Sequence, residues 1–148
     1  MSLSDWHRND WLVAHETSPQ EIAELLSISE RDLRDCLTEG LSPDWRLAIA
    51  YNSALQSASA ALAAAGYRAS REMHHYRIIQ SLTFTVRADA EFIAKFDAFR
   101  KKRNISDYER SGAVSDQEAG EMFLLAKQLK EMVEKWIRED YPELLKSK

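Results

Sequence analysis

The sequence predicts an all-α protein, an antiparallel up-and-down helical bundle with short N-terminal helices packed on it. Prolines and most glycines stand where helices would begin or end, and the segments between them carry apolar residues at helical spacing. Beyond the short run 83–86, the sequence lacks the alternation typical of strands. With 148 residues, the chain has the length of one ordinary domain. We therefore expect a single domain over 1–148, with short helices over 1–41 and the bundle over 42–141.

The N-terminal part predicts short helical pieces. An amphipathic stretch containing tryptophan covers 6–15. At Ser18 a capping serine precedes a proline at the first helical position, and Glu21 follows three residues later, able to reach back to the cap. We expect two short helices here, over 19–26 and 30–37, lying against the end of the bundle.

The longest helix is expected over 44–65. Ser42 and the proline after it repeat the start signal, and Gly66 is suited to a left-handed residue at the helix end. Apolar residues recur at helical spacing, and the many alanines among them allow a neighbouring helix to approach closely. The predicted inward positions are Ala48, Tyr51, Leu55, Ala58, Leu62 and Ala65.

Further helices are expected in the second half of the chain. Ser70 is the predicted cap of one helix, with a break near Arg87, and Ser115 with Glu118 is a capping box for the last. Each predicted helix has an inward stripe, and the stripes comprise Met73, Tyr76, Ile79 and Leu82, then Phe92, Phe96 and Phe99, and finally Met122, Leu125, Leu129, Met132 and Trp136.

Composition excludes several classes of protein. A formal net charge of −4 argues against a surface built throughout to hold nucleic acid, although a local basic patch is compatible with it. Cys36 is the only cysteine, so an intrachain disulfide cannot form, and the four histidines do not have zinc-site spacings. We therefore expect neither a metal nor a cofactor. Without a bilayer-length apolar run or a signal peptide, the expected location is cytoplasmic.

Arg103 is the most informative polar residue. At helical spacing it projects on the same stripe as Phe92, Phe96 and Phe99, within about 20° of its centre. Burial of a guanidinium is costly unless it meets a carboxylate or a ligand. Two interpretations follow: a structural arginine that pairs or extends to solvent, or an arginine that faces an anion-binding cleft.

The residues before Arg103 are basic as well. Arg100, Lys101 and Lys102 complete a basic run at a predicted helix C-terminus, where the helix dipole favours cations. An ordinary solvated helix end explains this run, and a phosphate-contacting patch that also includes Arg110 is the functional alternative.

The segment from Phe99 through Arg103 and Asn104 to Tyr108 resembles the signature of the HEPN family, in which an arginine, often followed by a polar residue, precedes a histidine by a few residues. The order of predicted helices agrees, and the resemblance covers about 42–136. It implies a HEPN-like fold with a site formed by Arg103, Asn104 and Tyr108.

The resemblance also implies partners and a reaction. In RNA-cleaving HEPN domains, the arginine and histidine of two protomers meet at a dimer interface and promote attack by the ribose 2′-hydroxyl, without metal. For this chain it implies a homodimer that binds RNA or a nucleotide. Many HEPN proteins pair with a small nucleotidyltransferase in prokaryotic toxin and antitoxin systems, which implies such a partner protein here.

The chain departs from the family pattern at Tyr108. A phenol, with an ordinary pKa of about 10, cannot exchange protons at neutral pH as an imidazole does. Tyr108 is suited to donating a hydrogen bond or to stacking on a base. Binding without cleavage is therefore the expected activity, and an endoribonuclease of HEPN type is the enzyme class if cleavage occurs.

Two other functions are compatible with the sequence. The first is a non-enzymatic scaffold or protein-interaction module, which would hold Arg103 fully paired within the fold. The second is a helix-turn-helix over 19–37, although its candidate recognition helix over 30–35 is as acidic as it is basic and would attract DNA little. His74 and His75 are expected to have structural roles, because adjacent helical residues point about 100° apart and cannot form one metal clamp.

Overall fold

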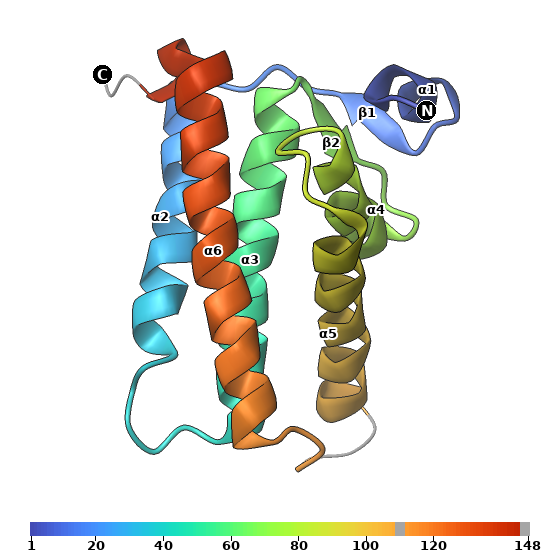
Figure 1. Ribbon diagram of the computed structural model, residues 1–148. Coiled ribbons are helices and arrows are strands. Elements are labelled where there is room, and N and C mark those ends of the chain that lie inside the picture. Colours follow the sequence, from blue (N-terminus) through green and yellow to red (C-terminus); the bar gives the residue numbers. More distant parts are fainter. Residues whose placement is uncertain (109–111, 146–148) are drawn as a thin grey trace.

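Four long helices form the bundle, and each runs antiparallel to the long helix before it in the chain (Figure 1). They are α2 (Pro19–Asp35), α3 (Pro43–Ala64), α5 (Ala90–Tyr108) and α6 (Asp116–Asp140). The computed structural model describes residues 1–108 and 112–145, and it describes side chains in the first range as far as residue 104. The predicted all-α bundle is confirmed. Within the described residues, no helix combines the length and apolar character needed to cross a membrane.

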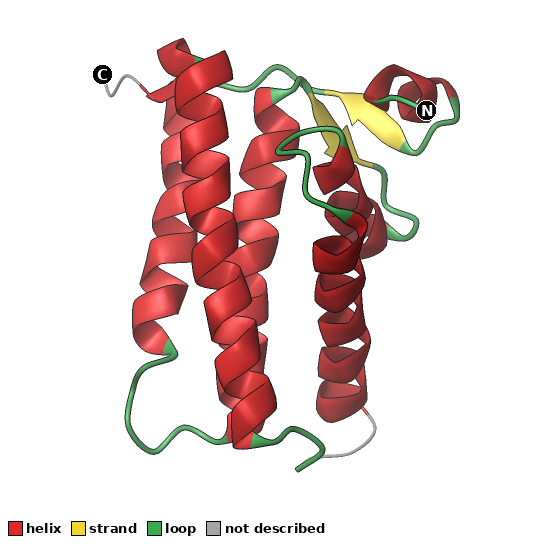
Figure 2. Cartoon of the chain, viewed as in Figure 1, coloured by secondary structure: helices red, strands yellow, loops and turns green. Residues whose placement is uncertain are grey.

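The short elements gather at one end of the bundle (Figure 2). They are α1 (Leu3–Arg8), β1 (Leu12–Ala14), β2 (Tyr67–Ala69), α4 (His74–Gln80) and the 3-10 helices η1 (Ser81–Thr83) and η2 (Pro142–Leu145). The two strands pair antiparallel, with Val13 opposite Arg68. The sequence did not predict this sheet, because three residues are too few for an alternating pattern to be visible. It also predicted helix over 6–15, where the structure has helix only to Arg8 and then β1.

Several predicted helix ends are confirmed. The side chains of Ser18, Ser42 and Ser115 each accept a hydrogen bond from a backbone N–H of the first turn, and Ser115 forms the predicted capping box with Glu118. Gly66 has φ of +99°, as expected of a residue that ends a helix in the left-handed conformation. The predicted break near residue 87 lies between η1 and α5.

The predicted cap at Ser70 is wrong. The Ser70 hydroxyl donates to the carbonyl of Asp10 at 2.8 Å and so ties β2 to the turn after α1. Helix α4 instead begins after Met73, which has φ of +53° and makes no side-chain capping hydrogen bond. The start of α4 is therefore set by the chain around it and not by a serine cap.

Helix α2 is continuous from Pro19 to Asp35, which corrects the two short helices predicted over 19–26 and 30–37. Residues 27–29, between the two predicted helices, are helical as well. Ser29 is fully buried, and its hydroxyl lies 2.9 Å from the Ser53 hydroxyl and 2.8 Å from that of Ser57, both on α3. The helix-turn-helix hypothesis therefore lacks its turn.

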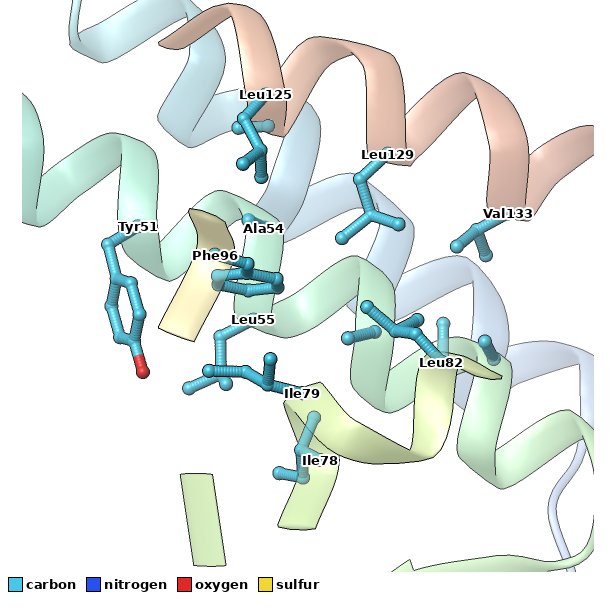
Figure 3. Packing of buried hydrophobic residues seen from close by; sticks show 14 of the residues in the cluster. Tyr51, Ala54, Leu55, Ile78, Ile79, Leu82, Phe96, Leu125, Leu129 and Val133 are labelled. Atoms are coloured by element: carbon cyan, nitrogen blue, oxygen red, sulfur yellow. The ribbon is translucent and has the colours of Figure 1, made fainter. Parts of the chain in front are cut away.

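The core is centred on α3, which packs against α2 and α6 and also contacts α4 and α5 (Figure 1). Its buried positions include Ala50, Ala54, Ala58 and Ala61, each with 0% exposure. Figure 3 shows larger side chains from α6, α4 and η1 converging on this helix, among them Leu125, Leu129, Ile79 and Leu82. Small residues on the central helix thus leave room for large residues on its neighbours.

Substitution Ala54→Leu should test this packing. Because Ala54 is fully buried, three additional carbon atoms must displace side chains of neighbouring helices. We expect the free energy of unfolding to fall by about 1–3 kcal/mol, measured by urea denaturation. Ala23→Leu on the exposed face of α2 is the matched control and should change stability little. Equal stability of the two variants would contradict this account of the core.

Candidate functional site between α4 and α5

Polar and aromatic side chains of α4 and α5 line a cleft of about 300 Å³. Helix α4 follows β2 directly and packs on both α3 and α5, so the small sheet places it beside the C-terminal half of α5. The residues that line the cleft are Met73, His74, His75, Tyr76, Arg100 and Asn104. Two of these, Arg100 and Asn104, belong to the site predicted from sequence.

Tyr51 connects this cleft to the core. Its ring is 1% exposed and packs edge-on against Phe96, with ring centres 5.7 Å apart. Its hydroxyl is hydrogen-bonded to Nδ1 of His75 at 3.2 Å. In Figure 3 the hydroxyl of Tyr51 points away from the α6 residues. The imidazole of His75 is thus held in place by a side chain that is itself fixed by core packing.

Arg103 is half-buried beside the same tyrosine. Its guanidinium carbon lies 5.4 Å from the centre of the Tyr51 ring, a cation–π distance, and Nη1 donates to Oδ1 of Asn104 at 3.5 Å. The predicted stripe on α5 is present, since Phe96 and Phe99 are buried and Phe92 packs against the core. Arg103 therefore ends an apolar helix face at the edge of the α4–α5 cleft.

The basic run before Arg103 is largely paired with carboxylates. Arg100 donates through Nε to Oδ1 of Asp97 at 2.7 Å, and Lys101 lies 3.8 Å from the other oxygen of that carboxylate. Lys102 is turned toward α6, where its ammonium group lies 3.4 Å from Glu118. Lys101 thus shares Asp97 with Arg100, which lines the cleft, whereas Lys102 pairs with α6, and neither lysine lines the cleft.

Two predicted site residues lie outside the described side chains. Tyr108 is the last residue of α5, and its side chain is not among those described; Arg110 lies outside the described residues altogether. The structure therefore brings together Arg100, Arg103 and Asn104 of the predicted set.

The sequence interpretation missed His75 as a site residue. It assigned both histidines ordinary structural roles because neighbours on a helix diverge by about 100°. That divergence is what places them in different surroundings: His75 is hydrogen-bonded to Tyr51, whereas Nδ1 of His74 lies 3.1 Å from the carbonyl oxygen of Ser70. Across the described residues, no group of three or more histidine, cysteine, aspartate or glutamate side chains is arranged to hold a metal ion.

Burial and neighbouring cations set the protonation of the site. Burial lowers the pKa of His75, and the charges of Arg103, His74 and Arg100 lower it further. Burial likewise raises the pKa of the Tyr51 hydroxyl well above its ordinary value. At neutral pH the site thus holds a neutral imidazole and a protonated phenol beside the guanidinium groups of Arg100 and Arg103.

Comparisons with known proteins leave the chain without an assigned family. It matches no protein-family model, no curated protein and no solved structure. The site must therefore be interpreted from its own chemistry.

The His75→Gln variant should reveal the lowered pKa as a change in pH-dependent stability. Because the folded state disfavours the imidazolium, the unfolded chain takes up this proton first as the pH falls below about 6.5. The wild-type protein should therefore lose more free energy of unfolding than His75→Gln between pH 7 and pH 5, measured by urea denaturation at each pH. If His75→Gln lost as much free energy of unfolding over this pH range as the wild-type protein, the buried environment assigned to His75 would be contradicted.

Proposed function

We propose that this chain is a HEPN-like, homodimeric domain that binds single-stranded RNA at the α4–α5 cleft. The observation that carries the proposal is a cleft lined by Arg100, Asn104 and a neutral His75, with Arg103 beside it and hydrogen-bonded to Asn104. Arg103 and Asn104 are the two positions that match the family signature, and His75 supplies an imidazole that the local sequence around Tyr108 lacks.

The cleft has chemistry suited to a ribonucleotide. Guanidinium groups form paired, charge-assisted hydrogen bonds with phosphate oxygens, which Arg100 and Arg103 can supply. Tyr76 offers an aromatic face on which an unstacked base can lie, and the guanidinium carbon of Arg100 is already 5.6 Å from the centre of that ring. The chain as a whole carries a net charge of −4, so favourable contact with RNA would be confined to this locality.

Cleavage is a separate property of the same site. Attack by a ribose 2′-hydroxyl needs a group that removes its proton, and the neutral imidazole of His75 can accept one at neutral pH. Retained metal-independent ribonuclease activity would consequently depend on His75, whereas binding alone needs only the arginines and the aromatic surface.

Substitution Arg103→Ala tests the proposal. Loss of one charge-assisted contact to phosphate, about 1.5–3 kcal/mol, should weaken binding of labelled single-stranded RNA by about 10- to 100-fold in metal-free buffer. The matched control is Arg138→Ala, an exposed position on α6, which should bind as the wild-type protein does. Cleavage products are followed in the same reactions. Unchanged helicity by circular dichroism excludes unfolding, and equal binding by Arg103→Ala and the wild-type protein would refute the proposal.

The proposed homodimer has its own test. Sedimentation equilibrium should give a mass of twice the 17.0 kDa of the chain at micromolar concentration. We expect the dimer to place two Arg103 side chains at one shared cleft, so RNA binding and dimer formation should weaken together on dilution. A monomer that binds RNA would contradict the dimeric part of the proposal and leave the site itself standing.

A protein-interaction module is the second candidate, and one observation favours it. Helices α2 and α6 form a second groove, of about 320 Å³, in which Leu33, Leu37 and Phe123 are flanked by charged residues of both signs. Leu37 is 68% exposed. Failure of RNA to bind either the wild-type protein or Arg103→Ala would favour this function.

A further inference from the structure

A further pocket, of about 220 Å³, lies on the other side of α4 from the α4–α5 cleft. It is formed where α2, α3, β2 and α4 meet. Its apolar wall includes Leu25, Leu62 and Ile78. Its volume corresponds to about seven molecules of liquid water, which leaves room for a pyrimidine base. An apolar wall with a few converging polar groups is the usual composition of a small-molecule site.

Glu21 is the oriented polar group of this pocket. Its Oε1 atom accepts hydrogen bonds from the Thr17 hydroxyl at 2.5 Å and from Nε2 of His15 at 2.7 Å. These two bonds, together with the charges of His15 and Arg68, lower the pKa of Glu21 although burial opposes them. The carboxylate is therefore ionised at neutral pH, and both hydrogen bonds end on Oε1, which leaves the lone pairs of Oε2 to accept from a ligand donor.

The other charged side chain that lines the pocket is that of Arg68. Arg68 is exposed, and His15 and His74 stand at the pocket wall. A cationic ligand would meet repulsion from Arg68, whereas a ligand with an anionic group at one end and a neutral hydrogen-bond donor at the other is complementary to Arg68 and Glu21. A nucleoside monophosphate has this arrangement, with an amino group on its base and a phosphate beyond the ribose.

We propose that this pocket holds a cytosine base, with the exocyclic amino group donating to Oε2 of Glu21 and the phosphate contacting Arg68. A carboxylate accepts from the N4 amino group of cytosine, and uracil instead presents an acceptor at that position, which the carboxylate would repel. The ring lies against the apolar wall formed by α2, α3 and α4. The pocket therefore selects cytosine over uracil.

The pocket adjoins the α4–α5 cleft, because His74 lines both. An RNA strand that crosses α4 at His74 can place one nucleotide in each. The inference rests on the proposed function in taking RNA as the ligand of the protein. The inference and the proposed function can nevertheless be tested separately, because Glu21 and Arg68 are distant in sequence from Arg103 and a mononucleotide occupies one pocket at a time.

Calorimetric titration of the full chain with cytidine monophosphate and with uridine monophosphate tests the inference. The wild-type protein should bind the cytidine nucleotide at least about tenfold more tightly, since one lost hydrogen bond and one acceptor–acceptor contact distinguish the two bases. In Glu21→Gln the preference should fall to within about threefold, because the amide can donate to uracil as well as accept from cytosine. Glu24→Gln, on the exposed face of the same helix, should keep the wild-type preference.

A second variant tests the phosphate contact. Arg68→Ala should weaken binding of cytidine monophosphate about tenfold and leave binding of cytidine, which has no phosphate, unchanged. Equal affinity for the two nucleotides, absence of binding, or a preference that survives Glu21→Gln would overturn the inference. If RNA binding still depends on Arg103 in that case, the proposed function stands alone. A cytidine preference in a protein that fails to bind RNA would support the pocket and refute the RNA proposal.

Discussion

Close packing around α3 is the constraint on which the rest of the structure depends. Alanines at fully buried positions of this helix let α2 and α6 approach it, and the neighbours contribute the large side chains that fill the space. The α2 interface is polar as well as small: the Ser53 hydroxyl donates to the Ser29 carbonyl at 2.8 Å, and Asn52 donates to Asp32 at 2.7 Å. Because buried hydroxyl and carboxylate groups need defined partners, these bonds allow one register of α2 on α3.

The same helix transmits this rigidity to the candidate site. Tyr51 is buried in the core, and its hydroxyl is hydrogen-bonded to His75, which lines the cleft. Edge-on contact with Phe96 holds the ring, and the ring in turn carries the hydrogen bond to His75 and the cation–π contact with Arg103. Site residues from α4 and α5 are thus positioned by a residue from neither helix, as is expected of a site supported by packing.

The sequence was informative wherever one residue type determines a local structure. Serine caps, the proline after them and Gly66 located most helix ends correctly, because their effects act within a turn of the chain. The division of α2 into two short helices was wrong, and the buried Ser29 within it is hydrogen-bonded to Ser53 and Ser57, which lie on another helix. Contacts between helices cannot be recognised from the local sequence of one of them.

The candidate site was predictable only in part for the same reason. Arg103 could be recognised because a cation on an apolar stripe is anomalous within one helix. The importance of His75 depends on Tyr51, 24 residues earlier in sequence, and periodicity carries no information about a contact between different helices. The pairing of Lys102 with Glu118 could not be predicted either, because it joins two helices. Neither interpretation of the basic run, as a solvated helix end or as a phosphate-contacting patch, separated its members, although they turn to different neighbours.

The geometry of α4 explains how so short a helix can serve two pockets. Met73, with φ of +53°, turns the chain sharply into the helix, and a non-glycine residue in this conformation costs roughly 1–2 kcal/mol that surrounding contacts must offset. The three residues that follow then point in successive directions around the helix axis. His74 lies between the two pockets, His75 meets Tyr51, and Tyr76 faces the guanidinium of Arg100. The divergence of adjacent side chains, which excludes a single metal clamp, is therefore what lets one helical turn contribute to both sites.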